Sequence, residues 1–380
     1  MVQDILINNM KVLNIGLGKN LFGEEPEARR RQIEYGNLCE ELHVLTLYSG
    51  QDTQISRNVW IYGTIKGMRI IRLCHAFRKA REIIKRNGIN FITTQDPFFT
   101  GFIGWIIKRK FKIPLQVQIH TDFLSPYFWK ESFLNKIRVL IAKFLIPKAD
   151  CIRVVSERIK KSLLRVTHSP LRITILPIFV DIKKIQAAPR KTDLHKKYPQ
   201  FEFIILMASR LTKEKNIGLA IKAMAEIIKK HPKTGLVIAG DGPEKENLKF
   251  KIKNLNLSGN VILEPWTDDL ASYYKTADLF LLTSNYEGYG MAVVEAMAAG
   301  CPVITTDVGL AGEILINKKD GLVVSVGDKN KLTDAILALV ENPGLRAELV
   351  RNAVKTLSFW LSREEYLNAY RDSWLICRSS

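Results

Sequence analysis

The sequence predicts an α/β protein of two domains, each a parallel β-sheet covered by helices on both faces. Its 380 residues are about the length of two ordinary domains. Short runs rich in Val, Ile and Leu alternate with stretches of helical period along the chain, which is typical of parallel strands buried on both faces. A polar, Lys-rich interval at 181–200 separates two such series, and we expect it to be a linker.

The first series predicts a parallel sheet with helices between most of its strands. The strands are expected at 11–16, 43–48, 89–95, 114–120, 151–156 and 172–177. The helices are expected at 27–41, 70–87, 99–110, 131–146 and 157–166. The strand candidates are short apolar runs, whereas the helix candidates repeat apolar residues every three or four positions.

The second series predicts another parallel sheet and a C-terminal helix. The strands are expected at 201–209, 235–240, 260–264, 279–284, 302–307 and 321–325. Near the C-terminus, Tyr366, Tyr370 and Trp374 are spaced four residues apart, which places three aromatic rings on one helical face. We expect this face to pack against the rest of the protein rather than to bind a ligand.

The distribution of charge is the first indication of a partner. The formal charge of the chain is 57 − 38 = +19. Residues 1–185 hold 31 basic and 15 acidic side chains, a net of +16, whereas residues 186–380 hold 26 and 23, a net of +3. This asymmetry indicates an acidic partner for the first half: nucleic acid, an anionic membrane surface or a phosphorylated substrate. Solubility alone is the alternative explanation.

The cysteines and the apolar runs bear on the compartment. Five cysteines, an odd number without a CxxC pair, argue against a disulfide framework and against a structural zinc site. We therefore expect a reducing, cytoplasmic compartment. No apolar stretch approaches the ~20 residues that span a bilayer, and the N-terminus lacks a signal-peptide pattern. Neither a transmembrane helix nor a signal peptide is expected.

The strongest local signal for chemistry is SNYEGYGMAVVEAMAAG at 284–300, directly after a predicted strand. Glu287 and Glu295 are separated by seven residues, and Gly288 and Gly290 between them permit a tight turn and a close approach of backbone to ligand. The helix that follows begins with unpaired N–H groups, which suit phosphate. Because carboxylates commonly accept hydrogen bonds from ribose or sugar hydroxyls, the two glutamates are suited to hold a hydroxyl-rich ligand.

A second signal is MASRLTKEKN at 207–216, where Arg210 and Lys215 lie on a strand-to-helix turn. A guanidinium and an ammonium placed there suit a diphosphate. Taken alone, two such cations would more often be solvated loop charges.

Together these segments resemble glycosyltransferase family 4. The second half shares the two spaced glutamates, SRLTKEKN, AGDGPE and PVITTDVGLAGEIL, and the first half shares TTQDPFFTGFIG, QIHTDF, RVVSERI and ILPIFVD. The resemblance implies a GT-B fold, in which two Rossmann-like domains face a cleft. It implies an acceptor-binding domain at 1–182, joined by the C-terminal helix 360–380, and a nucleotide-sugar-binding domain at 183–359.

The resemblance also implies an activity and its residues. Members of this family transfer a sugar from a nucleotide-sugar donor with retention of configuration, usually without a bound metal, and this sequence has no Asp-x-Asp element. Arg210 and Lys215 are implied to bind the donor pyrophosphate and to stabilise the departing nucleotide diphosphate. Glu295 is implied to bind the ribose and Glu287 the donor sugar. His120 matches the family histidine that reaches the transferred sugar near the reacting carbon.

Backbone groups complete the implied donor site. Contacts to sugar and phosphate are implied for Gly288, Tyr289, Gly290 and Met291. Gly16, after the first predicted strand, is implied to lie under the phosphates, although the usual adjacent glycine pair is absent. Pro265 replaces a usual glycine, so recognition of the base is not carried over, and the donor is expected to be a UDP- or GDP-sugar.

The positive charge of the first half is consistent with binding of an acceptor at a membrane. The segments 69–86 and 131–148 predict basic amphipathic helices. The family's N-terminal domain takes the acceptor, often a membrane lipid, and each Lys or Arg near an anionic surface is worth ~1 kcal/mol. We therefore expect peripheral docking on the cytoplasmic leaflet and a lipid-linked or oligosaccharide acceptor. The alternative is core-packed helices with a solvated basic face.

Two other functions are alternatives to a transferase. A nucleic-acid-binding protein would explain the charge, but no aromatic-basic ribonucleoprotein motif or zinc-finger spacing is present. A catalytically inactive protein that only binds a nucleotide sugar is the other alternative on the same fold. The intact site residues argue against it.

Overall fold

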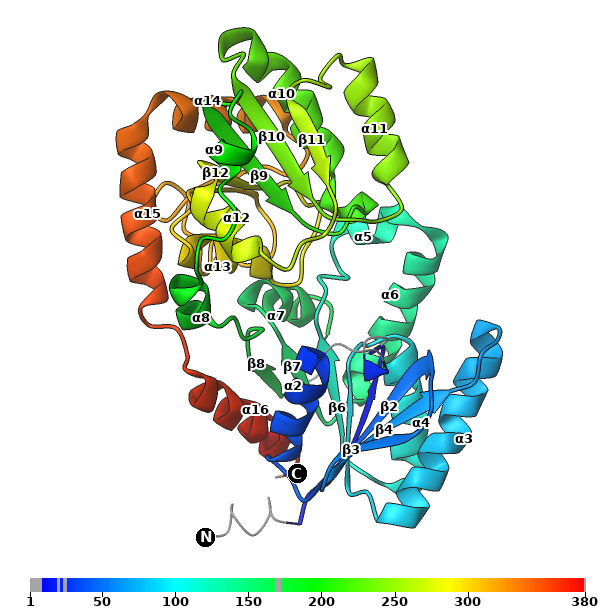
Figure 1. Ribbon diagram of the computed structural model, residues 1–380. Coiled ribbons are helices and arrows are strands. Elements are labelled where there is room, and N and C mark those ends of the chain that lie inside the picture. Colours follow the sequence, from blue (N-terminus) through cyan, green and yellow to red (C-terminus); the bar gives the residue numbers. More distant parts are fainter. Residues whose placement is uncertain (1–8, 19–20, 23–25, 168–171, 379–380) are drawn as a thin grey trace. The chain divides into compact units, whose positions relative to one another are not determined.

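The computed structural model describes residues 9–18, 21–22, 26–167 and 172–378, and within them the chain forms two compact units (Figure 1). Unit 1 consists of residues 1–124, 132–177 and 361–380. Unit 2 consists of residues 125–131 and 178–360.

This division differs from the predicted one at three places, of which the smallest is the C-terminal segment of unit 1, which begins at residue 361 rather than 360. The boundary lies after Pro177 rather than after residue 182, and the short segment Ser125–Glu131 groups with unit 2 although its flanking residues belong to unit 1. The grouping of this segment matters for the site, because the segment is helix α5 (Pro126–Glu131). Sequence patterns in six residues do not reveal which domain they pack against.

Unit 1 is built on an eight-stranded sheet in the order β3-β4-β2-β1-β5-β6-β7-β8. Its strands are β1 (Lys11–Gly16), β2 (Glu41–Ser49), β3 (Thr53–Ser56), β4 (Val59–Thr64), β5 (Phe91–Thr94), β6 (Leu115–Ile119), β7 (Cys151–Val154) and β8 (Ile173–Ile175). The described strands pair in parallel, as predicted, except for β3 and β4, which pair antiparallel at the edge. Prediction missed this hairpin because β3 is short, polar and largely exposed.

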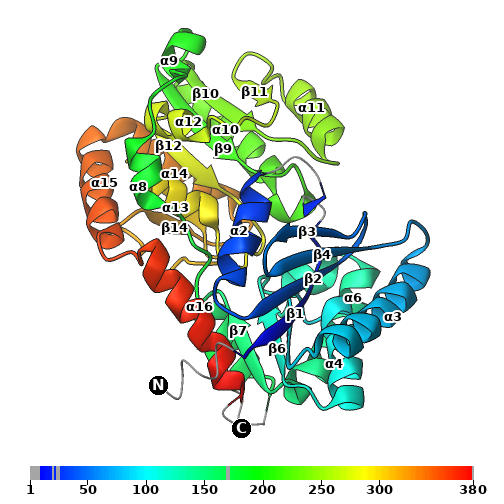
Figure 2. The same cartoon turned by 60° about the horizontal axis from the view of Figure 1, so that its bottom comes forward.

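Helices cover both faces of this sheet. They are α2 (Pro26–Gly36), α3 (Arg69–Asn87), α4 (Phe99–Phe111), α6 (Phe133–Leu145), α7 (Glu157–Leu164) and α16 (Arg363–Arg378). Figure 2 shows α3, α4 and α6 on one face and α2 and α16 on the other. The helix expected at 131–146 is α6, which begins after Ser132, whose hydroxyl caps it by accepting a hydrogen bond from the backbone of Asn135.

Helix α16 packs against β6 and β7, and its aromatic stripe is buried, as expected. The ring of Tyr370 stacks on that of Tyr35 from α2, with centroids 4.3 Å apart, and packs edge-on against Trp374. The stripe therefore serves packing, in which large aromatic side chains contribute a large share of the buried apolar area.

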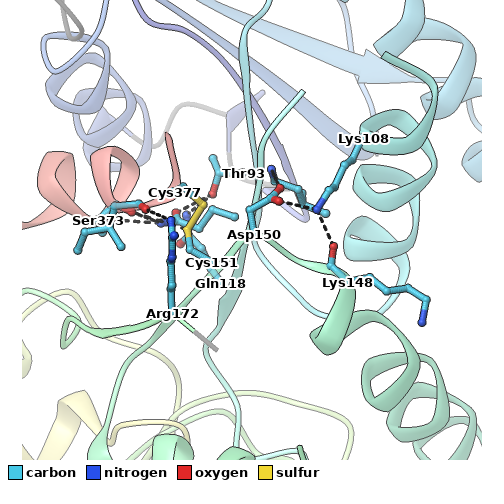
Figure 3. The surroundings of a disulfide bond; sticks show 12 residues. Thr93, Lys108, Gln118, Lys148, Asp150, Cys151, Arg172, Ser373 and Cys377 are labelled. Carbon is cyan, nitrogen blue, oxygen red and sulfur yellow. Dashed lines mark hydrogen bonds and ion pairs between the residues drawn. A yellow bond between two sulfur atoms is a disulfide. The ribbon is translucent and has the colours of Figure 1, made fainter. Parts of the chain in front are cut away.

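The expectation of no disulfide framework is wrong at one position. Cys151 in β7 and Cys377 in α16 form a disulfide bond that ties the C-terminal helix to the sheet (Figure 3). The two cysteines are 226 positions apart, so their spacing carried no signal. The inference from unpaired cysteines to a reducing compartment loses its basis, and the cytoplasmic location becomes a proposal.

Unit 2 contains a six-stranded parallel sheet in the order β11-β10-β9-β12-β13-β14. Its strands are β9 (Phe203–Ala208), β10 (Thr234–Ala239), β11 (Val261–Glu264), β12 (Leu279–Leu282), β13 (Val303–Thr306) and β14 (Leu322–Val324). All six fall within the predicted ranges or differ from them by one residue. These strands are apolar and almost wholly buried because both faces of the sheet are covered.

The helices of unit 2 lie in two layers. Helices α10 (Ile217–Lys230), α11 (Lys245–Asn254) and α14 (Lys329–Glu341) pack together over a large apolar core. Helices α8 (Ile182–Ala187), α9 (Leu194–Lys197), α12 (Leu270–Thr276) and α13 (Met291–Ala298) form the other layer. Helix α15 (Pro343–Leu357) contacts members of both layers.

The segment 181–200 is not the linker that its composition suggested. It contains α8 and α9, Leu194 is fully buried, and Lys191 donates a backbone hydrogen bond to Ser272 at 2.9 Å. Lysine-rich composition was misleading because lysine stems can lie along a folded surface while the charged ends stay in water.

Within the described residues, no helix combines the length and apolar character needed to cross a membrane.

Candidate active site

The predicted donor residues gather on two loops of unit 2 that follow adjacent strands. The first loop follows β9 and ends in the short 3₁₀ turn η3 (Lys213–Lys215), and the second follows β12 and ends where α13 begins. Ligands of parallel α/β sheets bind at this carboxyl end of the strands. The arrangement therefore brings the two sequence signals, 210–215 and 284–295, to one edge of one sheet.

Hydrogen bonds tie the two loops to each other. The hydroxyl of Thr283 donates to the backbone oxygens of Lys215 and Asn216, at 2.9 and 3.1 Å. The side chain of Asn216 donates to that of Asn285 at 3.0 Å, and the backbone of Asn285 donates to the carbonyl of Glu214 at 2.7 Å. Sequence analysis missed the linking residues Thr283, Asn216 and Asn285. They can join the two loops only because β9 pairs with β12, and no local sequence pattern predicts that pairing.

Lys215 and Glu287 form an ion pair at the centre of these loops. The ammonium of Lys215 donates to Oε1 of Glu287, and both side chains are largely buried. The hydroxyl of Ser284 donates to the same oxygen at 2.7 Å. Burial strengthens the pairing of such charges and holds the ammonium in one direction, which is what recognition of a phosphate requires.

Arg210 is placed differently from Lys215. Its guanidinium lies 3.2 Å from Glu214 and its side chain is 75% exposed, so it is held only by a surface ion pair of small energy. Arg210 and Lys215 share a loop but bind different carboxylates. Because that ion pair is weak, the exposed guanidinium can reorient toward a bound anion at small cost.

Glycines shape the turn before α13. Gly290 has a φ of 97°, a left-handed conformation that side chains rarely adopt. A Cβ on Gly309 would lie 2.3 Å from the backbone oxygen of Tyr289, so the loop after β13 can approach the motif only as glycine. The side chain of Tyr289 is buried, with its ring 6.5 Å from that of Trp360, which leaves the backbone to face a ligand.

Glu295 lies in helix α13, which follows the second loop. Its Oε2 accepts a hydrogen bond from Tyr274 of α12 at 3.0 Å. Burial raises the pKa of Glu295, and the hydrogen bond from Tyr274 opposes that rise because it favours the charged carboxylate. Sequence analysis missed Tyr274, since nothing in the sequence of the short helix α12 distinguishes this tyrosine from its neighbour Tyr273.

Helix α5 packs on the donor loops as part of unit 2. It contacts the turn η3, and the hydroxyl of Tyr286 donates to Oε2 of Glu131 at 2.7 Å. The ring of Phe128 meets that of Tyr286 edge-on, with centroids 5.4 Å apart. Tyr286 stands between Ser284 and Glu287 in the second loop, so α5 supports the loop that holds the ion pair.

The other two predicted residues belong to unit 1. Gly16 is the last residue of β1, and a Cβ there would lie 2.5 Å from the side-chain oxygen of Gln95, so any larger residue would displace that side chain. His120 follows the last residue of β6, and its Nε2 lies 3.1 Å from Oε1 of Gln118. Both stand at the carboxyl edge of the sheet, where ligand-binding residues are expected.

No cluster of three or more His, Cys, Asp or Glu side chains suited to hold a metal ion is found in the described part of the chain.

Comparison with known proteins places this geometry in a family. Residues 191–356 match the family described as Glycosyl transferases group 1, and residues 38–184 match Glycosyltransferase Family 4. The chain is 30% identical over 296 residues to an N-acetylgalactosamine-N,N'-diacetylbacillosaminyl-diphospho-undecaprenol 4-alpha-N-acetylgalactosaminyltransferase of Campylobacter jejuni, covering 76% of this chain and 77% of that protein. The chain belongs to glycosyltransferase family 4. It is an enzyme, a glycosyltransferase, as the sequence motifs implied.

A second relative and two solved structures extend the comparison. The chain is 29% identical over 295 residues to an alpha-monoglucosyldiacylglycerol synthase of Streptococcus pneumoniae, covering 74% of this chain and 66% of that protein. A sucrose-phosphate synthase of Thermosynechococcus elongatus superposes with a TM-score of 0.83 at 20% identity, covering 98% of this chain and 100% of the other. HepE of Anabaena, solved in complex with UDP-glucose, superposes with a TM-score of 0.75 at 18% identity, covering 98% of this chain and 100% of the other. The fold of this glycosyltransferase is GT-B, as expected.

Proposed function

We propose that this glycosyltransferase moves a hexose, with retention of configuration, from a UDP- or GDP-sugar to a lipid-linked or polysaccharide acceptor. The observation that carries the proposal is the pair of tied loops in unit 2, which hold Lys215, Glu287 and Glu295 at one edge of the sheet. The roles follow the chemistry of the groups. Lys215 and Arg210 bind the diphosphate, Glu287 binds the donor sugar and Glu295 binds the ribose.

The cations serve catalysis because charge develops on the leaving group. As the glycosidic bond breaks, negative charge grows on the nucleoside diphosphate, and a fixed ammonium stabilises that charge without reorganisation. Lys215 is positioned for this by Glu287, whose carboxylate also accepts from Ser284. The proposal needs no resident metal, since two cationic side chains supply the charge. The departing phosphate accepts the proton of the acceptor hydroxyl on the same face, which gives retention.

The names of the relatives support this donor chemistry and this stereochemistry. The two relatives are named for an alpha-glucosyl lipid and for a 4-alpha-N-acetylgalactosaminyl transfer, and the Anabaena structure contains UDP-glucose. Sugar nucleotides such as UDP-glucose carry the sugar in α linkage, so an α-linked product preserves the configuration. The names also support the acceptor, since one is a diacylglycerol lipid and the other an undecaprenol diphosphate.

An exposed apolar and basic surface on unit 1 supports a membrane-bound acceptor. Helices α3, α4 and α6 lie side by side on one face of the sheet, and their outer sides carry large apolar side chains in water. Ile70, Phe133 and Leu140 are 75%, 77% and 60% exposed. Leaving such side chains in water is unfavourable unless a partner covers them, and the basic residues among them favour an anionic bilayer over a second protein. We name this surface the α3–α4–α6 face.

Three arginines beside this face suit the phosphate of a lipid-linked acceptor. The pKa of Arg69 is lowered by burial and by the nearby charges of Arg138 and Arg72, and the carboxylate of Asp96 opposes this only in part. Arg69 lies over the ring of Phe99 at 3.9 Å. None of the three forms an ion pair with a carboxylate of the described residues. A bound phosphate or diphosphate would relieve the repulsion of Arg69 by the other two arginines.

A panel of UDP- and GDP-sugars, with release of nucleoside diphosphate as the readout, tests the proposal. Lys215→Ala is expected to reduce kcat at least about a hundredfold, the usual effect of removing one group that stabilises the charged leaving group. Lys213→Ala is the matched control, because Lys213 is an exposed cation of the same turn. If no nucleotide sugar is turned over, or if Lys215→Ala matches Lys213→Ala, the proposed donor site is wrong.

A further inference from the structure

We propose that Gln118 and Arg153 are positioning residues that hold His120 as a neutral imidazole with the proton on Nε2, so that Nδ1 accepts a hydrogen bond from a hydroxyl of the transferred sugar. The part that concerns the sugar rests on the proposed function. The part that concerns the proton rests only on contacts within unit 1. The two parts are therefore tested separately.

The orientation of the Gln118 amide follows from its neighbours. Arg153 has only donors, so the atom of Gln118 that faces its Nη1 at 2.8 Å must be the oxygen Oε1. The nitrogen Nε2 then donates to the hydroxyls of Thr93 and Tyr370, at 2.9 and 3.0 Å. Reversing the amide would set an NH₂ group against a guanidinium, so this orientation is the only one with every contact satisfied.

The tautomer of His120 follows from that orientation. Oε1 of Gln118 can only accept, so the imidazole Nε2 that lies 3.1 Å away must carry the hydrogen. In a neutral ring the lone pair is then on Nδ1. Among the described residues none bonds to Nδ1, which leaves it available to a ligand at the carboxyl edge of the sheet.

The charges around the ring oppose its protonation. Arg153 is 3% exposed, and in the described part of the chain its guanidinium meets uncharged partners: Gln118, the carbonyl of Leu176, the hydroxyl of Tyr366 and the ring of Tyr370. The charged groups that act on His120 are Arg153 of β7 and Arg31 of α2, both positive. Burial, and then these two cations, lower the pKa of His120 to about 3. The ring is thus uncharged throughout the neutral range.

The network continues into α16, which makes it stiff. Thr93 donates to Oε1 of Gln116 at 3.1 Å, and Nε2 of Gln116 donates to the carbonyl of Ser373 at 2.9 Å. Figure 3 shows Thr93, Gln118 and Ser373 beside the disulfide that joins β7 to α16. A buried network whose members are mutually bonded holds one geometry better than isolated pairs do. His120 is therefore oriented by residues that do not themselves face a ligand.

Nitrogen NMR of the wild-type protein labelled with ¹⁵N-histidine tests the tautomer directly. The chain has 6 histidines, and loss of one set of signals in His120→Gln identifies those of His120. We expect a protonated Nε2 and an unprotonated Nδ1 that do not change between about pH 5.5 and 8.5, well above the lowered pKa. A proton on Nδ1, or titration near the ordinary pKa of histidine, would overturn the proposal.

Gln118→Glu tests the consequence for turnover. A carboxylate at this position would stabilise the imidazolium and raise the pKa of His120 toward or above its ordinary value, so Nδ1 would become a donor at mildly acidic pH. We expect kcat/KM for the donor to fall about tenfold between pH 8.5 and pH 6, a loss absent from the wild-type profile.

Gln116→Glu is the matched control for this variant. Gln116 lies two residues earlier in β6, is equally buried and also bonds to Thr93 and to α16, but it does not contact His120. Gln116→Glu should therefore lose as much stability as Gln118→Glu, but its kcat/KM for the donor should not fall between pH 8.5 and pH 6. The same pH profile in both variants would show that the network is only structural and would overturn the proposal. If the wild-type tautomer is found but no nucleotide sugar is turned over, the proposed function fails while the positioning of the proton stands.

Discussion

At the residue scale, each largely buried side chain proposed to bind the donor has its orientation or its charge fixed by a neighbour in direct contact. Lys215 is aimed by Glu287, and Glu287 is held by Ser284. Glu295 owes part of its ionisation to Tyr274, a phenol from the preceding helix. Residue types that look uninformative in sequence therefore decide whether the chemically active ones have the right charge.

Acidic pH should weaken donor binding through Glu295. Because the folded pKa of Glu295 is raised, it takes up a proton at a higher pH than an exposed glutamate, and the neutral acid binds ribose hydroxyls less well. Tyr274→Phe removes the bond that favours the carboxylate. We expect a KM for the donor about fivefold higher, from the loss of one hydrogen bond of about 1 kcal/mol, and an acid limb at higher pH.

The pH dependence of the donor KM checks this prediction. Tyr62→Phe, which removes a hydroxyl bonded to His43 in unit 1, is the control for a general loss of stability. In Glu295→Gln, the rise of the donor KM at acidic pH should disappear, because the side chain no longer titrates. An unshifted limb in Tyr274→Phe would count against a role for Tyr274 in ionising Glu295.

At the element scale, short segments outside the two sheets hold the site together. Helix α5 is only six residues long, yet it packs on the turn that bears Lys215 and on the loop that bears Glu287. Helix α16 in turn backs β6 and β7, from which Gln118 and Arg153 act on His120. Each element is stabilised by a few specific contacts, which makes each one testable.

Removing the aromatic contact of α5 should weaken donor binding. Phe128→Ala deletes an edge-on aromatic pair with Tyr286, worth about 0.5–1.5 kcal/mol beyond buried area, and loosens the second loop. We expect donor affinity, measured by titration calorimetry, to fall about tenfold. Phe250→Ala, at an exposed phenylalanine of α11, is the control. Full donor affinity with only a lower melting temperature would show that α5 has no part in the site.

Loss of the disulfide should destabilise unit 1. Its two cysteines are 226 positions apart, and closing so long a loop stabilises the folded chain by about 5.4 kcal/mol in the chain-entropy account. Cys377→Ser should therefore lower the denaturant midpoint, and reduction of the wild type should do the same. Cys74→Ser, at an exposed free cysteine, is the control. An unchanged midpoint on reduction would contradict a stabilising role.

At the scale of the whole molecule, the charge asymmetry separates two tasks. The net of +16 lies in the half that forms most of unit 1, whereas the half with the donor loops is close to neutral. In the proposed function, unit 2 binds the donor phosphates with a few placed cations, so it needs no diffuse charge. The excess on unit 1 accompanies the exposed α3–α4–α6 face, and the two together favour an anionic bilayer.

Docking on that bilayer should depend on salt and on the exposed apolar side chains. We expect the full chain to float with vesicles that contain anionic lipid at low ionic strength and to be released as salt screens the charges. Phe133→Ser with Leu140→Ser should reduce the bound fraction at least about tenfold, by removing two apolar contacts. Phe250→Ser is the matched control from unit 2. No binding to anionic vesicles at low salt would refute docking.

Much of this protein could be predicted from its sequence, because strands buried on both faces leave continuous apolar runs. All six strands of unit 2 and the main helices of unit 1 were predicted in place, and the residues that carry the family motifs led to the correct enzyme class. Local chemistry also placed Lys215 and Glu287 on loops that follow strands and Glu295 in the helix after the second loop, where the structure has them. These inferences succeed because period, turn chemistry and motif spacing are properties of adjacent residues.

The tertiary structure decided whatever depends on residues distant in the chain. It paired Cys151 with Cys377, joined α5 to the loops of unit 2, and turned the supposed linker at 181–200 into packed helices. It also set Gln118 against His120 and Arg153 against Gln118, on neighbouring strands that a C-terminal helix covers. Such contacts are chosen by the packing of whole sheets, so no local pattern records them.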